Sequence, residues 1–197
     1  ADPNIPFLFT KVDLKDGYWR MCVNANDAWN FAYVLPKLKP SEPTRLVIPD
    51  ALQMGWSESP PFFCAATETA RDVIQKYMDS ELKLPTHKLE KFIINPNNIQ
   101  VQKPKHSINC IEIYMDDFIV ITNNAEENNI KKLTRATLHG IHSIFPPPEV
   151  TGHDGKDPIS ESKLKKKEGL WDTSKEILGW EFDGKNYTIK LPKEKFL

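Results

Sequence analysis

Two adjacent aspartates, Asp116 and Asp117, interrupt an apolar stretch of the sequence in which charge is unusual. Residues 110–122 read CIEIYMDDFIVIT, a pattern typical of two short strands joined by a tight turn. Carboxylates held this close repel each other unless cations neutralise them, and Mg²⁺ prefers hard oxygen ligands of this kind. Asp-Asp is also an ordinary turn dipeptide that water solvates, so the pair alone does not define a site.

A third acid, Asp13, ends another apolar stretch, Phe9-Thr10-Lys11-Val12. An acid at this position is also common in turns and helix caps. If the strand end and the hairpin meet, however, the three carboxylates can hold two divalent ions about 4 Å apart, which is the arrangement of two-metal phosphoryl transfer. The sequence therefore raises the hypothesis of a site in which Asp13, Asp116 and Asp117 bind two Mg²⁺ or Mn²⁺ ions.

The elements that must position these acids are a mixture of strands and helices. Apolar residues at three- or four-residue spacing predict a helix from Ser59, at the N-cap, to about residue 78, and a second helix over 126–145 that ends at Pro146. Regular β-α-β alternation is missing, so we expect the α+β class. The predicted strands are 7–13, 20–23, 31–35, 45–48, the hairpin 110–122, and a C-terminal hairpin with strands 177–182 and 187–191.

Two polar segments, near 79–109 and 149–169, separate these elements, and we interpret both as insertions. The chain begins with Ala1 and shows no signal-peptide pattern, so we expect it to be a piece of a longer protein.

The composition of the 197 residues excludes several classes of protein. With 40% hydrophobic and 27% charged residues, the chain has enough apolar material for one folded domain. It contains no apolar run of membrane-spanning length. Three cysteines (Cys22, Cys64 and Cys110) form neither a closed disulfide framework nor a zinc motif, which favours reduced intracellular thiols. The net charge of −1 points to no particular partner.

Four motifs, in order, resemble those of reverse transcriptases. Tyr-Met-Asp-Asp at 114–117 is similar to the central motif of that family, and Asp13 followed five residues later by Tyr18 is similar to its first palm motif. Residues 52–60, LQMGWSESP, resemble its second motif, and Leu178-Gly179-Trp180 resembles the primer-grip hairpin. The residues of the first motif, FTKVDLKDGY at 9–18, and of the last, ILGW at 177–180, resemble those of long-terminal-repeat retroelements of the Gypsy type.

The resemblance implies a polymerase palm over 1–197: a small antiparallel sheet backed by helices, with fingers largely missing. Residues 20–58 would be partial fingers, and 175–191 the primer-grip-like hairpin. The implied activity is RNA-directed DNA polymerisation with two Mg²⁺ or Mn²⁺ ions. The implied partners are an RNA/DNA template-primer, deoxynucleoside triphosphates and the fingers, thumb and RNase H of the parent polyprotein, without a membrane. The implied location is intracellular, in cytoplasmic virus-like particles or in the nucleus.

The resemblance also implies residue roles. Asp13 and Asp116 would be the main metal ligands, with Asp117 assisting and the Leu14 carbonyl completing the set. Residues that would contact the nucleotide are Leu14, Lys15, Asp16, Gly17, Tyr18, Met54 and Gly55. Residues that would contact primer or template are Trp56, Met115, Leu178, Gly179 and Trp180.

Three of these roles have simpler alternatives. Tyr18 would be a steric gate beneath the sugar, or else a core tyrosine. Lys167 would be the general acid for pyrophosphate, or else a solvated lysine in a charged run. Trp56 would be a template contact, or else a packed aromatic. Met54 stands where retroviral relatives usually have Gln, which removes a hydrogen bond to the nucleotide.

Two other functions compete with polymerisation. One is a catalytically inactive or domesticated retroelement fragment that binds nucleic acid. The other is a different palm-based nucleotidyl transferase, such as a cyclase. A cyclase needs no primer, so the Gly-Trp-x-x-Ser-Pro motif and the primer-grip-like hairpin argue against it.

Overall fold

The computed structural model describes residues 4–94, 104–151 and 155–195, and the chain divides into two compact units. Unit 1 comprises Ala1–Lys15 and Ala66–Leu197, and unit 2 comprises Asp16–Ala65. The predicted mixture of helices with small antiparallel sheets is confirmed. Within the described ranges, no helix combines the length and apolar character that a membrane crossing requires.

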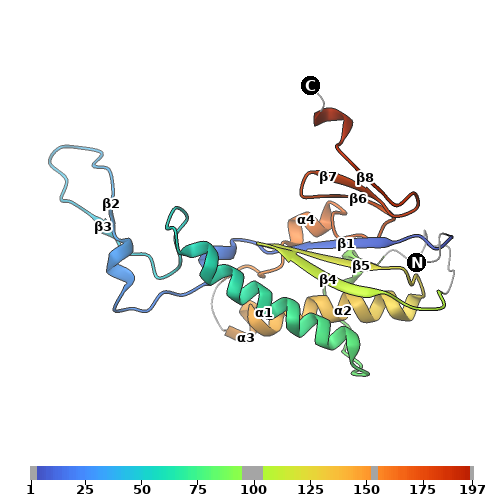
Figure 1. Ribbon diagram of the computed structural model, residues 1–197. Coiled ribbons are helices and arrows are strands. Elements are labelled where there is room, and N and C mark those ends of the chain that lie inside the picture. Colours follow the sequence, from blue (N-terminus) through green and yellow to red (C-terminus); the bar gives the residue numbers. More distant parts are fainter. Residues whose placement is uncertain (1–3, 95–103, 152–154, 196–197) are drawn as a thin grey trace. The chain divides into compact units, whose positions relative to one another are not determined.

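Unit 1 contains the central sheet and most of the helices (Figure 1). Helix α1 (Ser59–Asp79) begins in unit 2 and continues into unit 1. The other elements of unit 1 are β1 (Leu8–Asp13), η3 (Glu90–Phe92), β4 (Asn109–Tyr114), β5 (Asp117–Thr122), α2 (Glu127–Ile144), α3 (Pro148–Thr151), α4 (Glu161–Lys165), β6 (Ser174–Ile177), β7 (Trp180–Asp183), β8 (Thr188–Lys190) and η4 (Lys193–Lys195).

The central sheet has the order β1-β5-β4, and both strand pairs are antiparallel. Strands β4 and β5 form the hairpin that the sequence predicts, and its turn holds Met115 and Asp116. β1 pairs with β5 along its whole length, from Leu8 opposite Thr122 to Asp13 opposite Asp117. This pairing brings the two acidic segments of the sequence together.

One face of the sheet packs against helices. Leu8, Val12 and Val120 alternate along their strands toward this face and are almost completely buried. α2, which the sequence predicts correctly, supplies Leu133 and Ile141 to the same core. The remaining α2 residues that are buried are Ile130, Thr134, Ala136, Thr137, Leu138 and Gly140.

Helix α1 also protects the edge of the sheet at β4. The Gln75 side chain accepts a hydrogen bond from the Ile111 N–H (3.2 Å) and donates one to the Asn109 carbonyl (3.4 Å). Unpaired groups on an edge strand are open to pairing with another chain, so this contact covers part of that edge.

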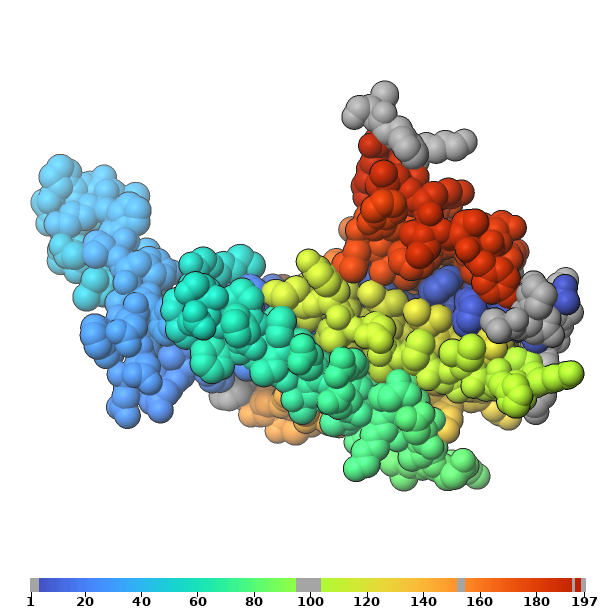
Figure 2. Space-filling model, viewed as in Figure 1, coloured from blue at the N-terminus to red at the C-terminus, as the bar shows by residue number. Residues whose placement is uncertain are grey.

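The opposite face of the sheet carries the β6-β7-β8 meander, which rises from the body of unit 1 in Figure 2. Phe9, Ile119 and Ile177 form a buried cluster there. The predicted continuous strand over 177–182 is wrong, because Leu178 (φ 50°) and Gly179 (φ 81°) form a two-residue turn between β6 and β7. Two positive φ angles match the twist of paired strands, and glycine adopts one of them without strain.

Both segments that the sequence marks as polar contain buried apolar residues. In the first segment, Leu89 and Ile93 are buried, and residues 95–103 lie outside the described residues. Ile159 and Leu164 are buried within 155–169. The described parts of both segments therefore contribute to the core of unit 1.

Unit 2 is built from short elements: η1 (Gly17–Arg20), η2 (Ala28–Phe31), β2 (Tyr33–Val34), β3 (Leu46–Val47) and the first turns of α1. The predicted strand over 20–23 is wrong, because the chain forms η1 and then only a single bridge from Cys22 to Ala51. η1 takes up Arg20, and Met21 to Val23 then run extended beside residues 50–52, with the Val23 N–H donating to the Asp50 carbonyl (2.7 Å) and the Leu52 N–H to the Met21 carbonyl (2.9 Å). At the start of α1, the Ser59 hydroxyl donates to the Gln53 carbonyl (2.7 Å), and Ser59 is itself the first residue of the helix.

Candidate active site

Asp13 and Asp117 lie directly opposite each other on β1 and β5. Side chains alternate between the two faces of a strand, so both acids share the face that carries Phe9 and Ile119. The meander covers this face around Phe9. Further along the same face, beyond Lys11 opposite Ile119, the last ladder position holds the two carboxylates side by side.

The hairpin turn places Asp116 next to this pair. Met115 has a positive φ of 57°, and the Asp116 carbonyl accepts a hydrogen bond from the Leu14 N–H (2.9 Å). This bond ties the turn to the residue that follows Asp13. The structure thus brings Asp13, Leu14, Asp116 and Asp117 together, and it puts Asp117 in register with Asp13.

Two lysines contact the acids. Lys163, on α4, forms an ion pair and a hydrogen bond with Asp13. Lys11 lies two residues before Asp13 on the same face, and its Nζ is 3.6 Å from the Asp117 Oδ1 atom. The sequence analysis missed Lys163, because a run of four lysines between 163 and 167 gives no signal that separates one from another.

The electrostatics of the pair are strained. Burial raises the pKa of Asp13; Lys163 lowers it, and the charge of Asp117 raises it again. The net effect is a pKa above the usual value for an aspartate. The Oδ1 atom of Asp117 is buried and has no hydrogen-bond partner among the described residues. Both observations describe carboxylates that lack full compensation for their charge.

A divalent cation fits this charge pattern. It would bind the Asp117 oxygen more closely than Lys11 does at 3.6 Å and would relieve the repulsion between the two acids. In the described part of the chain, however, no three acidic, histidine or cysteine side chains are grouped so as to hold a metal ion. The two-ion site thus stays a prediction. Asp13 and Asp117 are its two ligands on paired strands, and Lys163 forms an ion pair with the Asp13 carboxylate.

A cavity of about 540 Å³ adjoins the acids within unit 1. Asp117 and Lys11 line one part of it, and Leu178 and Gly179, from the β6–β7 turn, line another. The remaining lining residues are Lys167, Glu168, Asp172, Ser174, Lys175 and Glu176. The predicted primer-grip turn and the predicted metal ligand therefore face one cavity, whereas Trp180, at the start of β7, is not among its lining residues.

Two further lysines of this cavity differ in their surroundings. Lys167, the predicted general acid, is exposed and has a positive φ of 70°. Lys175 donates a hydrogen bond to the Glu168 carbonyl (2.8 Å), and burial together with the charge of Lys11 lowers its pKa to about 8. Lys175 was not singled out from the sequence, because nothing in the pattern around it marks it as buried.

The predicted nucleotide-binding residues fall in both units. Lys15 belongs to unit 1, and its N–H donates to the Pro158 carbonyl (2.7 Å). Asp16, Gly17, Tyr18, Met54 and Gly55 belong to unit 2. The Tyr18 ring packs edge-on against Phe63, with centroids 5.1 Å apart. A Cβ at Gly17 would lie 2.5 Å from the Phe63 ring, so glycine is required there by this close packing.

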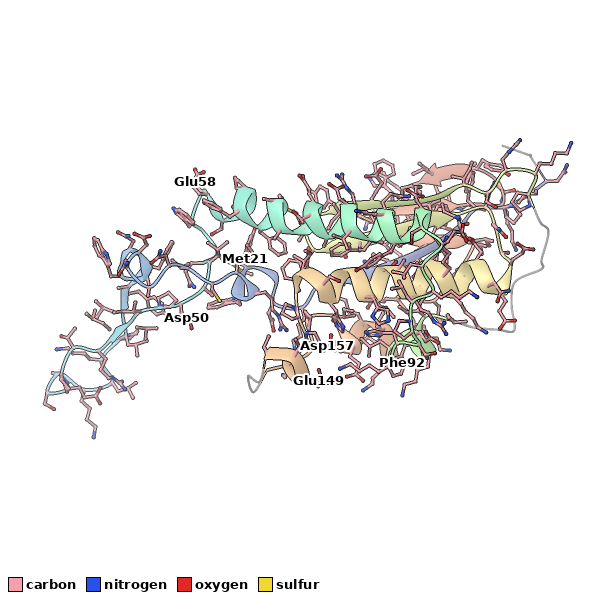
Figure 3. All side chains as sticks on the ribbon, turned by 90° about the horizontal axis from the view of Figure 1, so that it is seen from below. Met21, Asp50, Glu58, Phe92, Glu149 and Asp157 are labelled. Atoms are coloured by element: carbon pink, nitrogen blue, oxygen red, sulfur yellow. The ribbon has the colours of Figure 1, made fainter. Side chains whose placement is uncertain are left out.

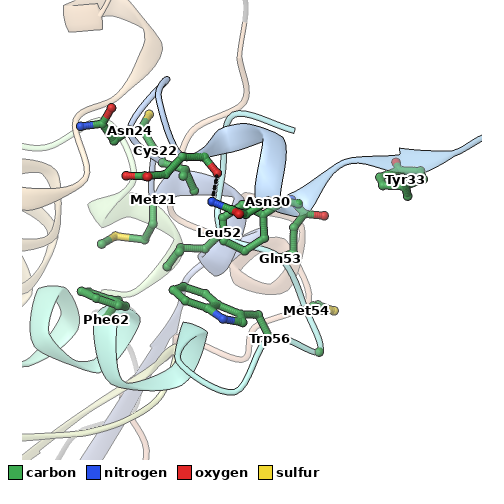
Figure 4. Close-up of a pocket in the computed structure, with 14 residues that line it drawn as sticks. Met21, Cys22, Asn24, Asn30, Tyr33, Leu52, Gln53, Met54, Trp56 and Phe62 are labelled. Atoms are coloured by element: carbon green, nitrogen blue, oxygen red, sulfur yellow. Dashed lines mark hydrogen bonds between the residues drawn. The ribbon is translucent and has the colours of Figure 1, made fainter. Parts of the chain in front are cut away.

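Unit 2 has its own cavity of about 980 Å³, with aromatic and amide side chains in its lining (Figure 4). The Trp56 ring stacks on Phe62 (centroids 5.8 Å apart) and meets Phe31 edge-on (5.1 Å). Met54 is highly exposed, and Gly55 has a positive φ of 93°. Trp56 therefore contacts two aromatic rings of unit 2 and also lines the cavity, and its template contact stays a prediction.

Comparison with known proteins assigns no family to the chain: no protein-family model matches it, and no curated protein matches it. The resemblance to reverse transcriptases therefore rests on the four sequence motifs.

Proposed function

We propose that this chain is the palm region of an RNA-directed DNA polymerase, and that Asp13, Asp116 and Asp117 form its catalytic site. The observation that carries the proposal is the register of β1 and β5, which sets Asp13 opposite Asp117 with Asp116 in the adjoining turn. Apolar packing alone does not explain a buried and a half-buried carboxylate at this position, because like charges directly opposite on a sheet are destabilising, even with Lys163 and Lys11 nearby.

The proposed reaction joins the 3′-hydroxyl of a primer to the α-phosphate of a deoxynucleoside triphosphate and releases pyrophosphate. Two Mg²⁺ or Mn²⁺ ions, when bound, would lower the pKa of the attacking hydroxyl and neutralise the leaving oxygens. Asp13 and Asp117 would hold these ions from the sheet, and Asp116 would do so from the turn. The cavity between Asp117 and the Leu178–Gly179 turn supports the proposal, since the end of a primer would need space beside the acids.

The other proposed roles depend on residues outside this pair of strands. Tyr18 would select the sugar of the incoming nucleotide, with Phe63 holding its ring. Lys167 or Lys175 would protonate the leaving pyrophosphate. The fingers, thumb and RNase H of a parent polyprotein would complete the polymerase, and without them we expect this chain alone to extend primers poorly, because positioning supplies much of the rate in such reactions.

One observation favours a second function, that of an inactive fragment which binds nucleic acid. The Lys163 ammonium group is paired with Asp13, the position where a catalytic cation would bind. A lysine that remains there in solution would replace the cation and leave a folded but non-catalytic palm.

Manganese binding distinguishes the two functions without requiring polymerase activity. We would titrate the full chain with Mn²⁺ and follow free Mn²⁺ by electron paramagnetic resonance. We expect weak binding in the wild type and loss of that binding in Asp117→Asn. Asp72→Asn is the matched control, since Asp72 is an exposed acid paired with Arg71 on α1.

Crosslinking then tests the nucleic-acid side of the proposal. A DNA primer with a photoreactive 3′ nucleotide, annealed to an RNA template, should crosslink near Met115 and the Leu178–Gly179 turn, and more strongly with Mn²⁺. If the crosslinking yield at these residues is the same with and without Mn²⁺, and no Mn²⁺ binding is measured, the result would support the inactive fragment. No crosslinking at either place and no Mn²⁺ binding would refute both functions.

A further inference from the structure

A chain of three hydrogen-bonded side chains lies near the C-terminal end of α2, in unit 1 and outside the acid site. The Nε2 atom of His87 is 3.1 Å from the Nδ1 atom of His142, and the Nε2 atom of His142 is 2.9 Å from the Asp157 carboxylate. His87 is only 7% exposed. Figure 3 labels Asp157 and Glu149 in this region. We refer to His87, His142 and Asp157 as the histidine clamp.

The backbone fixes the direction of every bond in the clamp. The Leu89 N–H donates to the His87 Nδ1 atom (3.1 Å), so a neutral His87 carries its proton on Nε2. That proton is donated to the Nδ1 atom of His142, so His142 also carries its proton on Nε2 and donates it to Asp157. Both imidazoles are therefore neutral in the closed clamp, each as the Nε2–H tautomer.

An added proton has no acceptor within this chain of bonds. If it enters His87 at Nδ1, two donors face each other at Leu89. If it enters His142 at Nδ1, two donors face each other between the histidines. Burial is the main cause that lowers the pKa of His87, to about 4, and the nearby imidazoles of His142 and His139, which would repel a charged His87 if they were protonated, lower it further. The geometry and the pKa thus agree that the closed clamp excludes the proton.

The other charged groups around the clamp are bound to partners of their own. Lys88 forms ion pairs with Asp157 (3.0 Å) and Glu149 (2.7 Å), and it disfavours a charged His87. The His87 N–H donates to Glu90 (3.1 Å), which Arg135 holds at 2.8 Å. The remaining titratable neighbour is His139, whose ring meets His87 edge-on at 5.0 Å and whose Nε2 atom contacts the Pro85 carbonyl.

The clamp also holds the backbone beside the acid site. The Asp157 carboxylate accepts the Ile159 N–H (3.0 Å), and Ile159 bridges to Leu14. One residue later, the Ser160 N–H donates to the Asp13 carbonyl (2.9 Å). Residues 158–160 therefore form a short extra ladder along the end of β1, and α4 with Lys163 follows immediately.

We propose that the histidine clamp is a proton-sensitive switch, which is closed at neutral pH and opens on acidification, releasing residues 157–160 from α2. This inference goes beyond polymerisation and does not depend on it, because every contact that carries it lies outside the three acids. Its consequence for the site is that the ladder beside Asp13 is held in place only while the clamp is closed.

Imidazole NMR and amide hydrogen exchange on the full chain test the switch. At pH 7.5 we expect both histidines as Nε2–H tautomers. With a pKa of about 4 in the closed clamp and about 6.5 when open, the opening equilibrium should rise roughly 30-fold between pH 7.5 and pH 5. After correction for intrinsic exchange, the Ile159 and Ser160 amides should report this increase.

Two variants make the result specific. His87→Gln keeps a hydrogen-bonding side chain but cannot titrate, so the pH response of Ile159 and Ser160 should disappear. His139 lies on α2, as His142 does, but it is outside the clamp, so the pH response should remain in His139→Gln. If His87→Gln does not fold, the wild-type spectra still decide: a His87 that titrates near pH 6.5, or an Nδ1–H tautomer, would overturn the proposal, as would an unchanged response in folded His87→Gln.

Discussion

Replacing Asp13 by asparagine should stabilise the fold while removing the predicted metal site. Asp13 is buried opposite Asp117, and its raised pKa means that the charged form is disfavoured in the folded protein. Asn has nearly the same shape, so Asp13→Asn removes the repulsion without opening a cavity. Lys163 then loses its partner, but its side chain is 42% exposed and water can solvate it.

The expected size of the effect follows from these contacts. Like charges directly opposite on paired strands cost about 0.2–1 kcal/mol. Partial burial of the Asp13 carboxylate adds to that cost, and the loss of a half-exposed ion pair subtracts at most about 1 kcal/mol. We therefore expect a small net gain, of up to about 1 kcal/mol, in the free energy of unfolding at pH 7.

The stability difference between the wild type and Asp13→Asn should depend on pH, in the direction set by the raised pKa of Asp13. A carboxyl with a raised pKa in the folded state binds its proton more tightly there, so wild-type stability falls as pH rises through the unfolded value of 3.8 and the higher folded value. Asn does not titrate. The advantage of Asp13→Asn should thus be largest at neutral pH and should shrink as pH falls toward 3.8.

Urea unfolding followed by tryptophan fluorescence measures this, because the buried Trp171 reports on unit 1. Asp72→Asn, at an exposed acid, should change stability by less than about 0.5 kcal/mol. A loss of 1 kcal/mol or more in Asp13→Asn, or a gain that persists unchanged at pH 4, would refute the reasoning and make Asp13 a structural residue.

Two further substitutions test the contact between Gly140 and Ile74 and the strain of the β6–β7 turn. Gly140→Ala should lower the free energy of unfolding by about 1–2 kcal/mol despite the helix propensity of alanine, because the new Cβ would collide with the Ile74 side chain. In an Ile74→Ala background the same change should become neutral or favourable. A double-mutant cycle measured by urea unfolding would show this difference. Leu178→Asn should raise the free energy of unfolding by about 1 kcal/mol, because asparagine tolerates the φ of 50° better than leucine, and an equal or lower stability in thermal unfolding would contradict the strained turn.

The elements that the sequence predicts well are those whose signal is local. α1, α2 and the β4–β5 hairpin each carry an apolar period over many residues, and all three appear at nearly the predicted bounds. The turn at Leu178–Gly179 was missed because a leucine at positive φ has no sequence signature. The strand predicted at 20–23 failed because η1 and the Tyr18–Phe63 contact decide the local structure.

The parts of the site that could not be predicted depend on contacts between distant residues. Lys163 meets Asp13 across 150 positions of the sequence, and His87 meets His142 across 55. Neither lysine runs nor single histidines indicate such partners. The acids themselves could be singled out because Asp13 ends one apolar strand and Asp116 and Asp117 lie where two others meet, which is a local pattern with a physical meaning.

The apolar pattern of β1 and β5 is what forces the two acids together. Leu8 and Val12 must face the helices, and Phe9 must face the meander, so both faces of β1 are committed. A shift of one residue in the register would turn every β1 side chain to the wrong face. The observed register buries these apolar residues and also sets Asp13 against Asp117. Burial explains the strands but not the acids, since neutral residues at both positions would satisfy the same pattern at lower cost. That unexplained cost is the strongest reason to look for a cation between them.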